Sequence, residues 1–342
     1  MTSLGAACLI AFVTTWLATP VARTLAARAR LLDIPNARSS HSVPTARTGG
    51  LAIILGTGVS VAATTPVDWQ LGFLLLAAAA VAVLGQIDDA RGLSPGVRLI
   101  GQALAAAILV GVADLSLGPA DPSIAATGAW LLAGVATMVW IVGVTNAYNF
   151  MDGINGLAAA QAVIAAGTLA VLADRHGDVA GAGLLVAIAG AAAGFLPWNF
   201  PSGSIFMGDI GSGTIGIALA GMIVRLSTRS VSLAAAALPL APFLLDTGAT
   251  LARRIWRRED VLRAHRSHFY QRLVALGYSH GAVTAIWVLL AVVSSLAAMA
   301  YDRVGTPARI GLLAAVCLAH LLVAAVIVRS ERGAAREDDV AL

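Results

Sequence analysis

The sequence predicts an all-α fold, a polytopic integral membrane bundle of about eleven transmembrane helices. The 342-residue chain is 58% hydrophobic, its mean hydropathy is +0.85, and only 12% of its residues are charged. Ordinary soluble domains carry about 25% charged residues, so this composition excludes a soluble globular protein. Apolar segments of about 17–25 residues, the length that crosses a bilayer, recur along the whole chain. We therefore expect the lipid bilayer as a partner, and no nucleic acid.

The apolar segments follow one another with short polar breaks. We interpret the first segment as a retained transmembrane helix and not as a signal peptide, because it has no charged n-region and no obvious cleavage site. The segments 49–65 and 212–226 are short and Gly-rich, so ten spans is the alternative count. Small residues let transmembrane helices pack closely, and Cys8 and Cys317 are expected to be inert packing residues. The predicted spans lie around 3–22, 49–65, 71–87, 97–113, 128–145, 157–173, 180–197, 212–226, 231–252, 281–300 and 310–328.

The arginines predict the orientation of the bundle. One set of loops, which includes 23–48, 253–280 and the tail after 328, carries 17 of the 22 arginines when Arg98 is counted with it. Loops rich in basic residues stay in the cytoplasm. The N-terminus is therefore predicted to be periplasmic and the C-terminus cytoplasmic, in a bacterial inner membrane. We expect residues 1–330 to form a single transmembrane catalytic domain with cytoplasmic active-site loops, and 331–342 a short charged tail.

Chemistry-bearing side chains gather in four cytoplasmic segments. Carboxylates are hard oxygen ligands that suit Mg²⁺, with Mn²⁺ as the alternative, when substrate phosphates supply further ligands. Arginines bind phosphates through bidentate contacts. Acids, a metal and guanidinium groups together are typical of phosphoryl transfer. The candidates are Asp88, Asp89 and Arg98; Asn146, Asn149, Asp152 and Asn155; Asn199, Phe206 and Asp209; and His265, His268 and Arg272.

Each group also has a plainer interpretation. Asp88 and Asp89 would form an ordinary polar helix end, and His265 and His268 would be interfacial histidines in an arginine-rich loop. Asp246 lies seven residues before the first arginine of that loop, so it is about 10 Å deep in the membrane at 1.5 Å per residue. Intramembrane acids normally face the bundle and find a partner. For Asp246 we therefore favour a structural or cavity-lining role over direct catalysis.

Five motifs in order resemble one family, the polyprenyl-phosphate N-acetylhexosamine-1-phosphate transferases. The resemblance runs from about residue 33 to 273 and agrees with the predicted topology. The motifs are DIPNARSSH with the following GG, GQIDDARGLSPGVRLIGQ, NAYNFMDGINGLA, GFLPWNFPSGSIFMGDIGSGTIG and HRSHFYQRL.

The resemblance implies roles for individual residues. Asp88 and Asp89 match the paired aspartates that are needed for activity, tied to the metal or to activation of the lipid phosphate. Asp209 matches a Mg²⁺ ligand, with Asp89 as the second candidate ligand, and Phe206 matches the aromatic residue that stacks on uracil. The remaining matches are substrate-binding positions: Asn146, Asn149, Asp152 and Asn199 around the nucleotide, and His265 and His268 near the diphosphate and sugar.

This chain also departs from the family pattern. Asn155 stands where many members have a second aspartate, and Arg98 where a lysine is common. HRSHFYQRL, which includes Arg272, differs from the triple-histidine loop of the muramoyl-pentapeptide enzymes. It is more similar to members that start O-antigen or other surface glycans.

These patterns together predict a transferase. It would move a sugar 1-phosphate from a UDP-N-acetylhexosamine to undecaprenyl phosphate and release UMP, with its active site facing the cytoplasm. The alternatives are a muramoyl-pentapeptide-type peptidoglycan transferase, a proton-coupled transporter that uses Asp246 and the paired aspartates, and a non-catalytic scaffold. The sequence leaves open the sugar, direct attack against a covalent aspartyl intermediate, which of Asp88 and Asp89 holds the metal, and whether the chain forms a homodimer.

Overall fold

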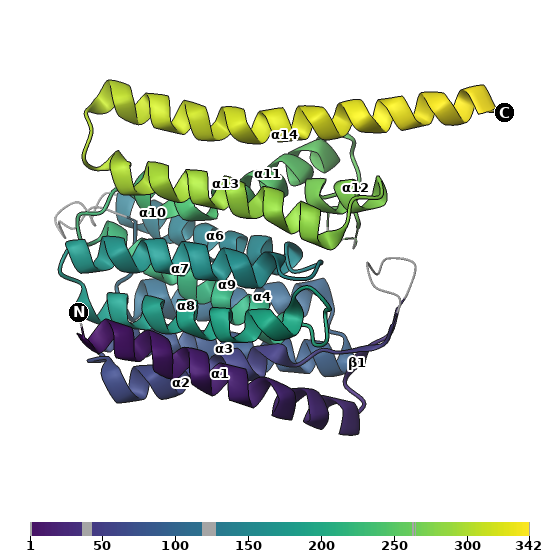
Figure 1. Ribbon diagram of the computed structural model, residues 1–342. Coiled ribbons are helices and arrows are strands. Elements are labelled where there is room, and N and C mark those ends of the chain that lie inside the picture. The colour runs from purple at the N-terminus through teal and green to yellow at the C-terminus, as the bar shows by residue number, and fades with distance from the viewer. Residues whose placement is uncertain (1, 36–42, 118–127, 262, 264, 342) are drawn as a thin grey trace.

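The computed structural model describes residues 2–35, 43–117, 128–261, 263 and 265–341, and it is a bundle of long helices (Figure 1). The predicted all-α membrane fold class is confirmed. The helices are α1 (Thr2–Arg28), α2 (Gly49–Thr64), α3 (Trp69–Arg91), α4 (Pro95–Gly111), α6 (Ala129–Phe150), α7 (Leu157–Arg175), α8 (Val179–Asn199), α9 (Gly208–Ser227), α10 (Leu233–Ala237), the 3-10 helix η1 (Leu238–Leu240), α11 (Ala241–Trp256), α12 (Phe269–Ala275), α13 (His280–Tyr301) and α14 (Thr306–Ala341).

Every predicted apolar segment falls on a helix. Within the described residues, nine helices are long and apolar enough to cross a membrane, with α10, η1 and α11 counted as one continuous span. The apolar helices α2 and α4 are shorter, with 16 and 17 residues, or about 24–26 Å at 1.5 Å per residue. The predicted segment 212–226 is longer than expected, because α9 begins at Gly208 and takes Asp209 into its first turn.

Sequence signals fix the helix ends near the paired aspartates. Gly92 has a φ of 68° and ends α3 directly after Arg91, since glycine enters this left-handed region without a steric penalty. Ser94 caps α4 by accepting from the amide of Val97, and Pro95 occupies the first helical position, where its missing N–H costs nothing. Asp88 and Asp89 are therefore held in the last turn of α3.

A short N-terminal arm crosses the end of the bundle between α1 and α2. Its strands β1 (Leu32–Asp33) and β2 (Thr45–Ala46) pair antiparallel, and Ala46 also bridges to Ile205. The amides of Gly49 and Gly50 then donate to the carbonyls of Phe206 and Met207 at 2.9 and 2.8 Å. The arm thus holds the loop that leads into α9. Residues 36–42, which include most of the DIPNARSSH motif, lie outside the described residues.

Helix α9 lies at the centre of the bundle and packs against α3, α6 and α2. Small residues make these contacts close. A Cβ added at Gly85 of α3 would lie 2.6 Å from the backbone carbonyl of Asp209, and one at Gly211 would lie 2.8 Å from the Cα of Gly50. Since real Cβ atoms do not approach so closely, glycines here let α3 and α2 reach the first turn of α9.

At the opposite end of the bundle, one arginine fastens three helices together. Arg225 of α9 is fully buried and donates to both carboxylate oxygens of Asp68 and of Asp178, at 2.6 to 2.9 Å. Asp68 caps α3 and Asp178 caps α8. Hydrogen bonds from Arg225 lower the pKa of Asp68 below its ordinary value. Burial raises the pKa of Asp178, but the hydrogen bonds that it accepts outweigh burial and leave its pKa below the ordinary value as well. We refer to these three residues as the Arg225 clamp.

The elements that carry the candidate residues lie at the other end. In Figure 1 the helices run across the view, with β1 and α12 at the right and the N-terminus at the left. Helix α14 packs mainly against α13 and continues to Ala341, and Glu331 pairs with Arg272 of α12. The predicted division at residue 330 and the predicted orientation in the membrane stay predictions.

The orientation can be tested with single cysteines in a background without Cys8 and Cys317. Ser202 is exposed in the loop between α8 and α9, and Asp174 is exposed at the other end, in α7. We expect a membrane-impermeant thiol reagent to label S202C only in inverted vesicles and D174C in intact spheroplasts. The reverse pattern would place the acidic loops outside the cytoplasm.

Candidate active site

Four aspartates from three parts of the chain meet at the loop end of the bundle. Asp88 and Asp89 come from the last turn of α3, Asp209 from the first turn of α9, and Asp152 from the loop after α6. We call these residues the acid cluster. Two arginines, Arg47 of the N-terminal arm and Arg98 of α4, contact it.

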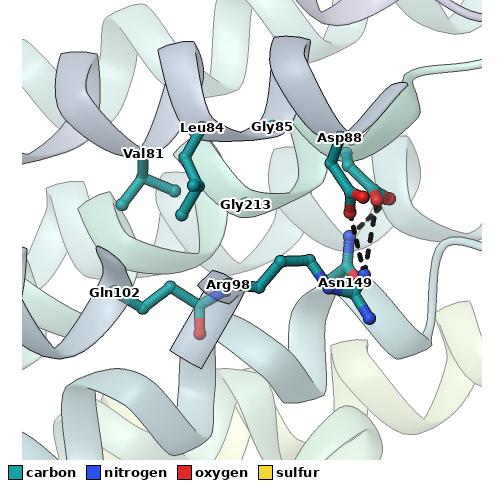
Figure 2. Close-up of a pocket in the computed structure, with 9 residues that line it drawn as sticks. Val81, Leu84, Gly85, Asp88, Arg98, Gln102, Asn149 and Gly213 are labelled. Atoms are coloured by element: carbon teal, nitrogen blue, oxygen red, sulfur yellow. Dashed lines mark hydrogen bonds and ion pairs between the residues drawn. The ribbon is translucent and has the colours of Figure 1, made fainter. Parts of the chain in front are cut away.

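Asp88 faces a cavity between α3, α4, α6 and α9. Its Oδ1 accepts from the amide of Leu93 at 2.6 Å, and its Oδ2 pairs with Arg98 at 3.0 Å (Figure 2). This cavity is lined by the polar residues Asp88, Arg98, Gln102, Asn149 and Asp209 and by the apolar residues Val81, Leu84, Gly85 and Gly213. Charged and apolar surfaces therefore meet in one space.

Asp89 has different partners, although it is the next residue. Its side chain is 1% exposed and accepts from the amides of Asp209 and Ile210 at 3.0 and 3.1 Å. Nε of Arg47 lies 2.9 Å from the same carboxylate. Asp89 thus holds the N-terminus of α9, where free amides and the helix dipole favour an anion. The two neighbouring carboxylates have separate surroundings.

Asp209 is the most shared member of the cluster. Its carboxylate accepts from Asn149 at 2.8 Å and lies 3.7 Å from Arg47 and 3.6 Å from Arg98. Asn149 also donates to Ser212, one turn further along α9. The Asp209 side chain is 22% exposed, against 7% for Asp88 and 1% for Asp89, and its ion pairs are long, so it remains open to a ligand.

Asp152 lies beside these acids without a salt bridge of its own among the described residues. Burial raises the pKa of Asp152 to about 7, and the nearby carboxylates of Asp209 and Asp89 add to the effect. A desolvated carboxyl group next to like charges resists ionisation. The acid cluster sets four carboxyl groups against two arginines, so full ionisation would leave it with excess negative charge.

The donor set fits a hard divalent cation that shares its ligands with a substrate. Among the described residues, no three acid, histidine or cysteine side chains form a ready-made metal cage. Mg²⁺ commonly uses only one or two protein carboxylates together with phosphate oxygens and water. Asp209 has the most accessible oxygens for this purpose. The role of Asp89 as a metal ligand stays a prediction, since its oxygens already hold α9 and Arg47.

The predicted amide residues have different partners. Asn146 donates to Gln102 and to the carbonyl of Val142, and it faces α4. Asn199 is buried, accepts from the amide of Gly156 and donates to the carbonyl of Ile205. Asn155 donates to the carbonyl of Pro201. Asn155 and Asn199 thus brace the loops that carry Asp152 and Phe206, and the structure shows them as supports of the site.

The histidine loop is fixed by Asp246. Asp246 Oδ1 accepts from the amide of Phe269 at 2.9 Å and lies 3.3 Å from Nδ1 of His268, and Oδ2 accepts from the amide of Tyr270 at 3.2 Å. The hydroxyl of Tyr270 in turn donates to the carbonyl of Phe150 at 2.9 Å. A structural role for Asp246 is what the sequence favoured, and these contacts link α12 to the loop of Asp152.

The other two candidate residues of this loop, His265 and Arg272, contact groups outside the acid cluster. The His265 ring lies 5.0 Å from the His268 ring, and burial, with the nearby His268 and Arg254, lowers the pKa of His265 to about 4. His265 is therefore neutral at pH 7 and would contact a diphosphate as a hydrogen-bonding group. Arg272 forms a two-bond ion pair with Glu331 of α14, so its guanidinium is already engaged.

The sequence reasoning missed two members of the site. Arg47 was counted only among the arginines that set orientation, although it lies two residues before Gly49 in the arm. Gln102, four residues after Arg98, shares a face of α4 with it and lines the cavity. An arginine and an amide beside glycines at a membrane boundary were the available signals.

Acids and arginines that gather around a cavity at one end of an apolar bundle are typical of enzymes that act on phosphate groups. The sequence profile of glycosyl transferase family 4 matches residues 71–227. This range includes α3, α4 and α9, which carry Asp88, Asp89, Arg98 and Asp209.

Curated relatives extend the match over most of the chain. A probable undecaprenyl-phosphate N-acetylglucosaminyl 1-phosphate transferase of Bacillus subtilis is 30% identical over 297 residues, covering 85% of this chain and 83% of the relative. A decaprenyl-phosphate N-acetylglucosaminephosphotransferase of Mycobacterium tuberculosis is 34% identical over 82% of this chain and 78% of its own length. A phospho-N-acetylmuramoyl-pentapeptide-transferase of Lactiplantibacillus plantarum is 36% identical over 47% of this chain and 53% of its own length.

The chain belongs to glycosyl transferase family 4, which confirms the family resemblance seen in its motifs. It is an enzyme, a phosphotransferase of the glycosyl-1-phosphate type.

Removing the Asp246 carboxylate should destabilise the protein. Asp246→Leu leaves the half-buried amide of Phe269 and the buried amide of Tyr270 without their acceptor, at a cost of up to about 1–3 kcal/mol for each group. We expect a lower Tm in detergent and faster proteolysis within residues 257–268, with Asp246→Asn intermediate. Asp174→Asn, at an exposed acid of α7, is the control. An unchanged Tm for Asp246→Leu would contradict the capping role.

The raised pKa of Asp152 predicts how stability depends on pH. The folded state binds this proton more tightly than the unfolded chain, whose carboxyl group has the ordinary value of 3.8. Stability in metal-free buffer should therefore fall as pH rises from about 4 to about 7, and then stay level. Asp152→Asn removes this component, so its advantage in Tm over the wild type should be larger at about pH 8 than at about pH 5. An equal difference in Tm between Asp152→Asn and the wild type at both pH values would contradict a raised pKa for Asp152.

Proposed function

We propose that this enzyme transfers N-acetylhexosamine 1-phosphate from a UDP-sugar to undecaprenyl phosphate on the cytoplasmic face of a bacterial membrane. The observation that supports it most is the acid cluster with Arg47 and Arg98 at the end of an apolar bundle. A lipid phosphate and a soluble nucleotide sugar can meet only at such a boundary. The product would be the first lipid-linked intermediate of a surface glycan such as an O-antigen. The relatives' names favour N-acetylglucosamine as the sugar.

The reaction is a single phosphoryl transfer. An oxygen of the lipid phosphate attacks the phosphorus that carries the sugar. The bond from that phosphorus to the bridging oxygen breaks, and UMP leaves with the bridging oxygen and its electron pair. Mg²⁺, held by Asp209 and the diphosphate, would neutralise the charge that develops on the leaving UMP. Arg47 and Arg98 supply fixed positive charge on the same side.

Asp88 suits a positioning role at the lipid phosphate. The second pKa of a phosphate monoester is about 6, so most of the lipid phosphate is already doubly ionised at pH 7. Its attack therefore needs little help from a base. Asp88 holds Arg98 at 3.0 Å beside the cavity. Arg98 would then orient the lipid phosphate for attack, with the prenyl chain toward the apolar residues that line the cavity. A covalent aspartyl intermediate would need Asp88 to give up Arg98 first.

The alternatives have less support. A transporter would use Asp246 as a proton site, but Asp246 accepts from two amides and contacts His268 and Thr250, and a proton site needs a carboxylate that is free to exchange. The muramoyl-pentapeptide relative is similar over only about half of this chain. The donor is therefore proposed to be a UDP-N-acetylhexosamine without a peptide.

The test is release of UMP by purified enzyme in nanodiscs. A panel of UDP-sugars is supplied with Mg²⁺, with and without undecaprenyl phosphate. We expect UMP only when lipid phosphate, Mg²⁺ and a UDP-N-acetylhexosamine are all present, and none from Asp209→Asn. No UMP from any member of the panel would overturn the proposal, and release only from a UDP-muramoyl-pentapeptide would favour the peptidoglycan alternative.

Phe206→Ala should weaken donor binding more than turnover. Phe206 lies between the arm and α9, where its carbonyl and amide pair with Gly49 and Ala46. Stacking on uracil would be equal in the ground and transition states, so its loss raises KM. The expected cost is on the order of 1–3 kcal/mol, by analogy with base–aromatic stacking. Phe206→Tyr, which keeps the ring, is the control, and a normal KM with a collapsed kcat would contradict stacking.

A further inference from the structure

Arg47 contacts two members of the acid cluster, Asp89 and Asp209, that differ in exposure. Nε of its guanidinium lies 2.9 Å from the buried Asp89. Nη2, on the same edge of the guanidinium, lies 3.7 Å from the more exposed Asp209. The first contact has hydrogen-bonding length and the second does not. Arg47 is therefore anchored at one end and loose at the other.

The surroundings of Arg47 allow this loose end to move without disturbing the fold. Its side chain is 33% exposed, against 1% for Asp89. The backbone on either side of Arg47 is fixed, because Ala46 accepts from Phe206 and Gly49 donates to it. The guanidinium thus stands on a rigid segment, beside the first turn of α9 and next to the candidate uracil residue.

Charge explains why the loose end matters. Arg47 and a divalent cation are both attracted to the Asp209 carboxylate, and they repel each other when both are close to it. A diphosphate would remove this conflict, since it offers oxygens to the metal and to a guanidinium at once. Arg47 would then oppose the metal before the donor arrives and favour it afterwards.

We propose that Arg47 binds the donor diphosphate and, while the donor is absent, competes with the metal for Asp209. Its Nε stays on Asp89, and its Nη1 and Nη2 groups meet the phosphates in place of Asp209. Metal and donor consequently bind with positive coupling, in which each raises the affinity for the other by the same factor. The inference deepens the proposed function, on which it rests.

The test measures binding, so it needs no turnover. Mn²⁺ affinity is measured by electron paramagnetic resonance with and without UDP, which keeps the uracil and the diphosphate but cannot transfer a sugar. Without UDP, we expect Arg47→Gln to bind Mn²⁺ more tightly than the wild type, by about 3- to 10-fold. With Mn²⁺ present, it should bind UDP about 10-fold more weakly, as expected for a lost charge-assisted hydrogen bond. The coupling between the two ligands should be largely lost.

Two control variants separate this role from simple charge or folding effects. Arg28→Gln removes an exposed arginine at the C-terminal end of α1. It should change neither the Mn²⁺ affinity nor the UDP affinity. Arg47→Lys keeps the charge but loses the two-edged guanidinium, so it should keep the weak Mn²⁺ binding and recover only part of the UDP affinity.

The outcomes are distinguishable. Unchanged or weaker Mn²⁺ binding by Arg47→Gln without UDP, at a native Tm, would show that Arg47 only supports Asp89, and it would overturn the inference alone. The same holds if Arg47→Gln unfolds and Arg47→Lys binds both ligands like the wild type. A wild-type enzyme that binds no UDP with Mn²⁺ would overturn the proposed function together with this inference.

Discussion

The buried carboxylate of Asp89 joins three segments that are far apart in the sequence. It lies in the last turn of α3, accepts from two amides in the first turn of α9 and pairs with Arg47 of the N-terminal arm. A buried charge is tolerated only when its hydrogen bonds are complete, and removing one partner leaves a costly uncompensated ion. The position of Asp209 follows from this contact, because its own amide is one of the donors. The site geometry thus depends on an acid that is itself almost closed to solvent.

Asp246 caps a helix in the same way at the histidine loop. There too a buried carboxylate inside the bundle accepts backbone amides at the start of a helix, and the helix then carries side chains to the site. Tyr270 passes the constraint on to the carbonyl of Phe150, directly before the loop of Asp152. In an apolar interior such charge-assisted bonds are stronger than in water. Two capping acids therefore set the loops, and the partly exposed Asp209, Arg47 and Arg98 are left for ligands.

The helices and most of the charged site could be predicted from the sequence, because membrane spans and clustered acids leave strong local patterns. Contacts between distant segments leave none. Nothing in IDDARG separates Asp88 from Asp89, since their difference depends on where α9 begins. The same holds for Asn199, which braces backbone at Gly156 and Ile205, and for Arg47, whose partners are about 40 and 160 residues away. Residue type predicted the chemistry, and only the packing of α3, α9 and the arm separates ligand-facing groups from supporting ones.

The two ion clusters of this protein show how that separation is made. Both contain arginines and aspartates at helix ends, so composition alone would assign them the same role. In the Arg225 clamp, the guanidinium is fully buried and both carboxylates meet it with two short bonds each. In the acid cluster, Arg47 and Arg98 are about a third exposed and reach Asp209 only at 3.6–3.7 Å. Complete pairing leaves no affinity for another ion, whereas four acids with two arginines retain it. Incomplete pairing of charge therefore distinguishes the candidate active site from the Arg225 clamp, whose charges are paired with one another.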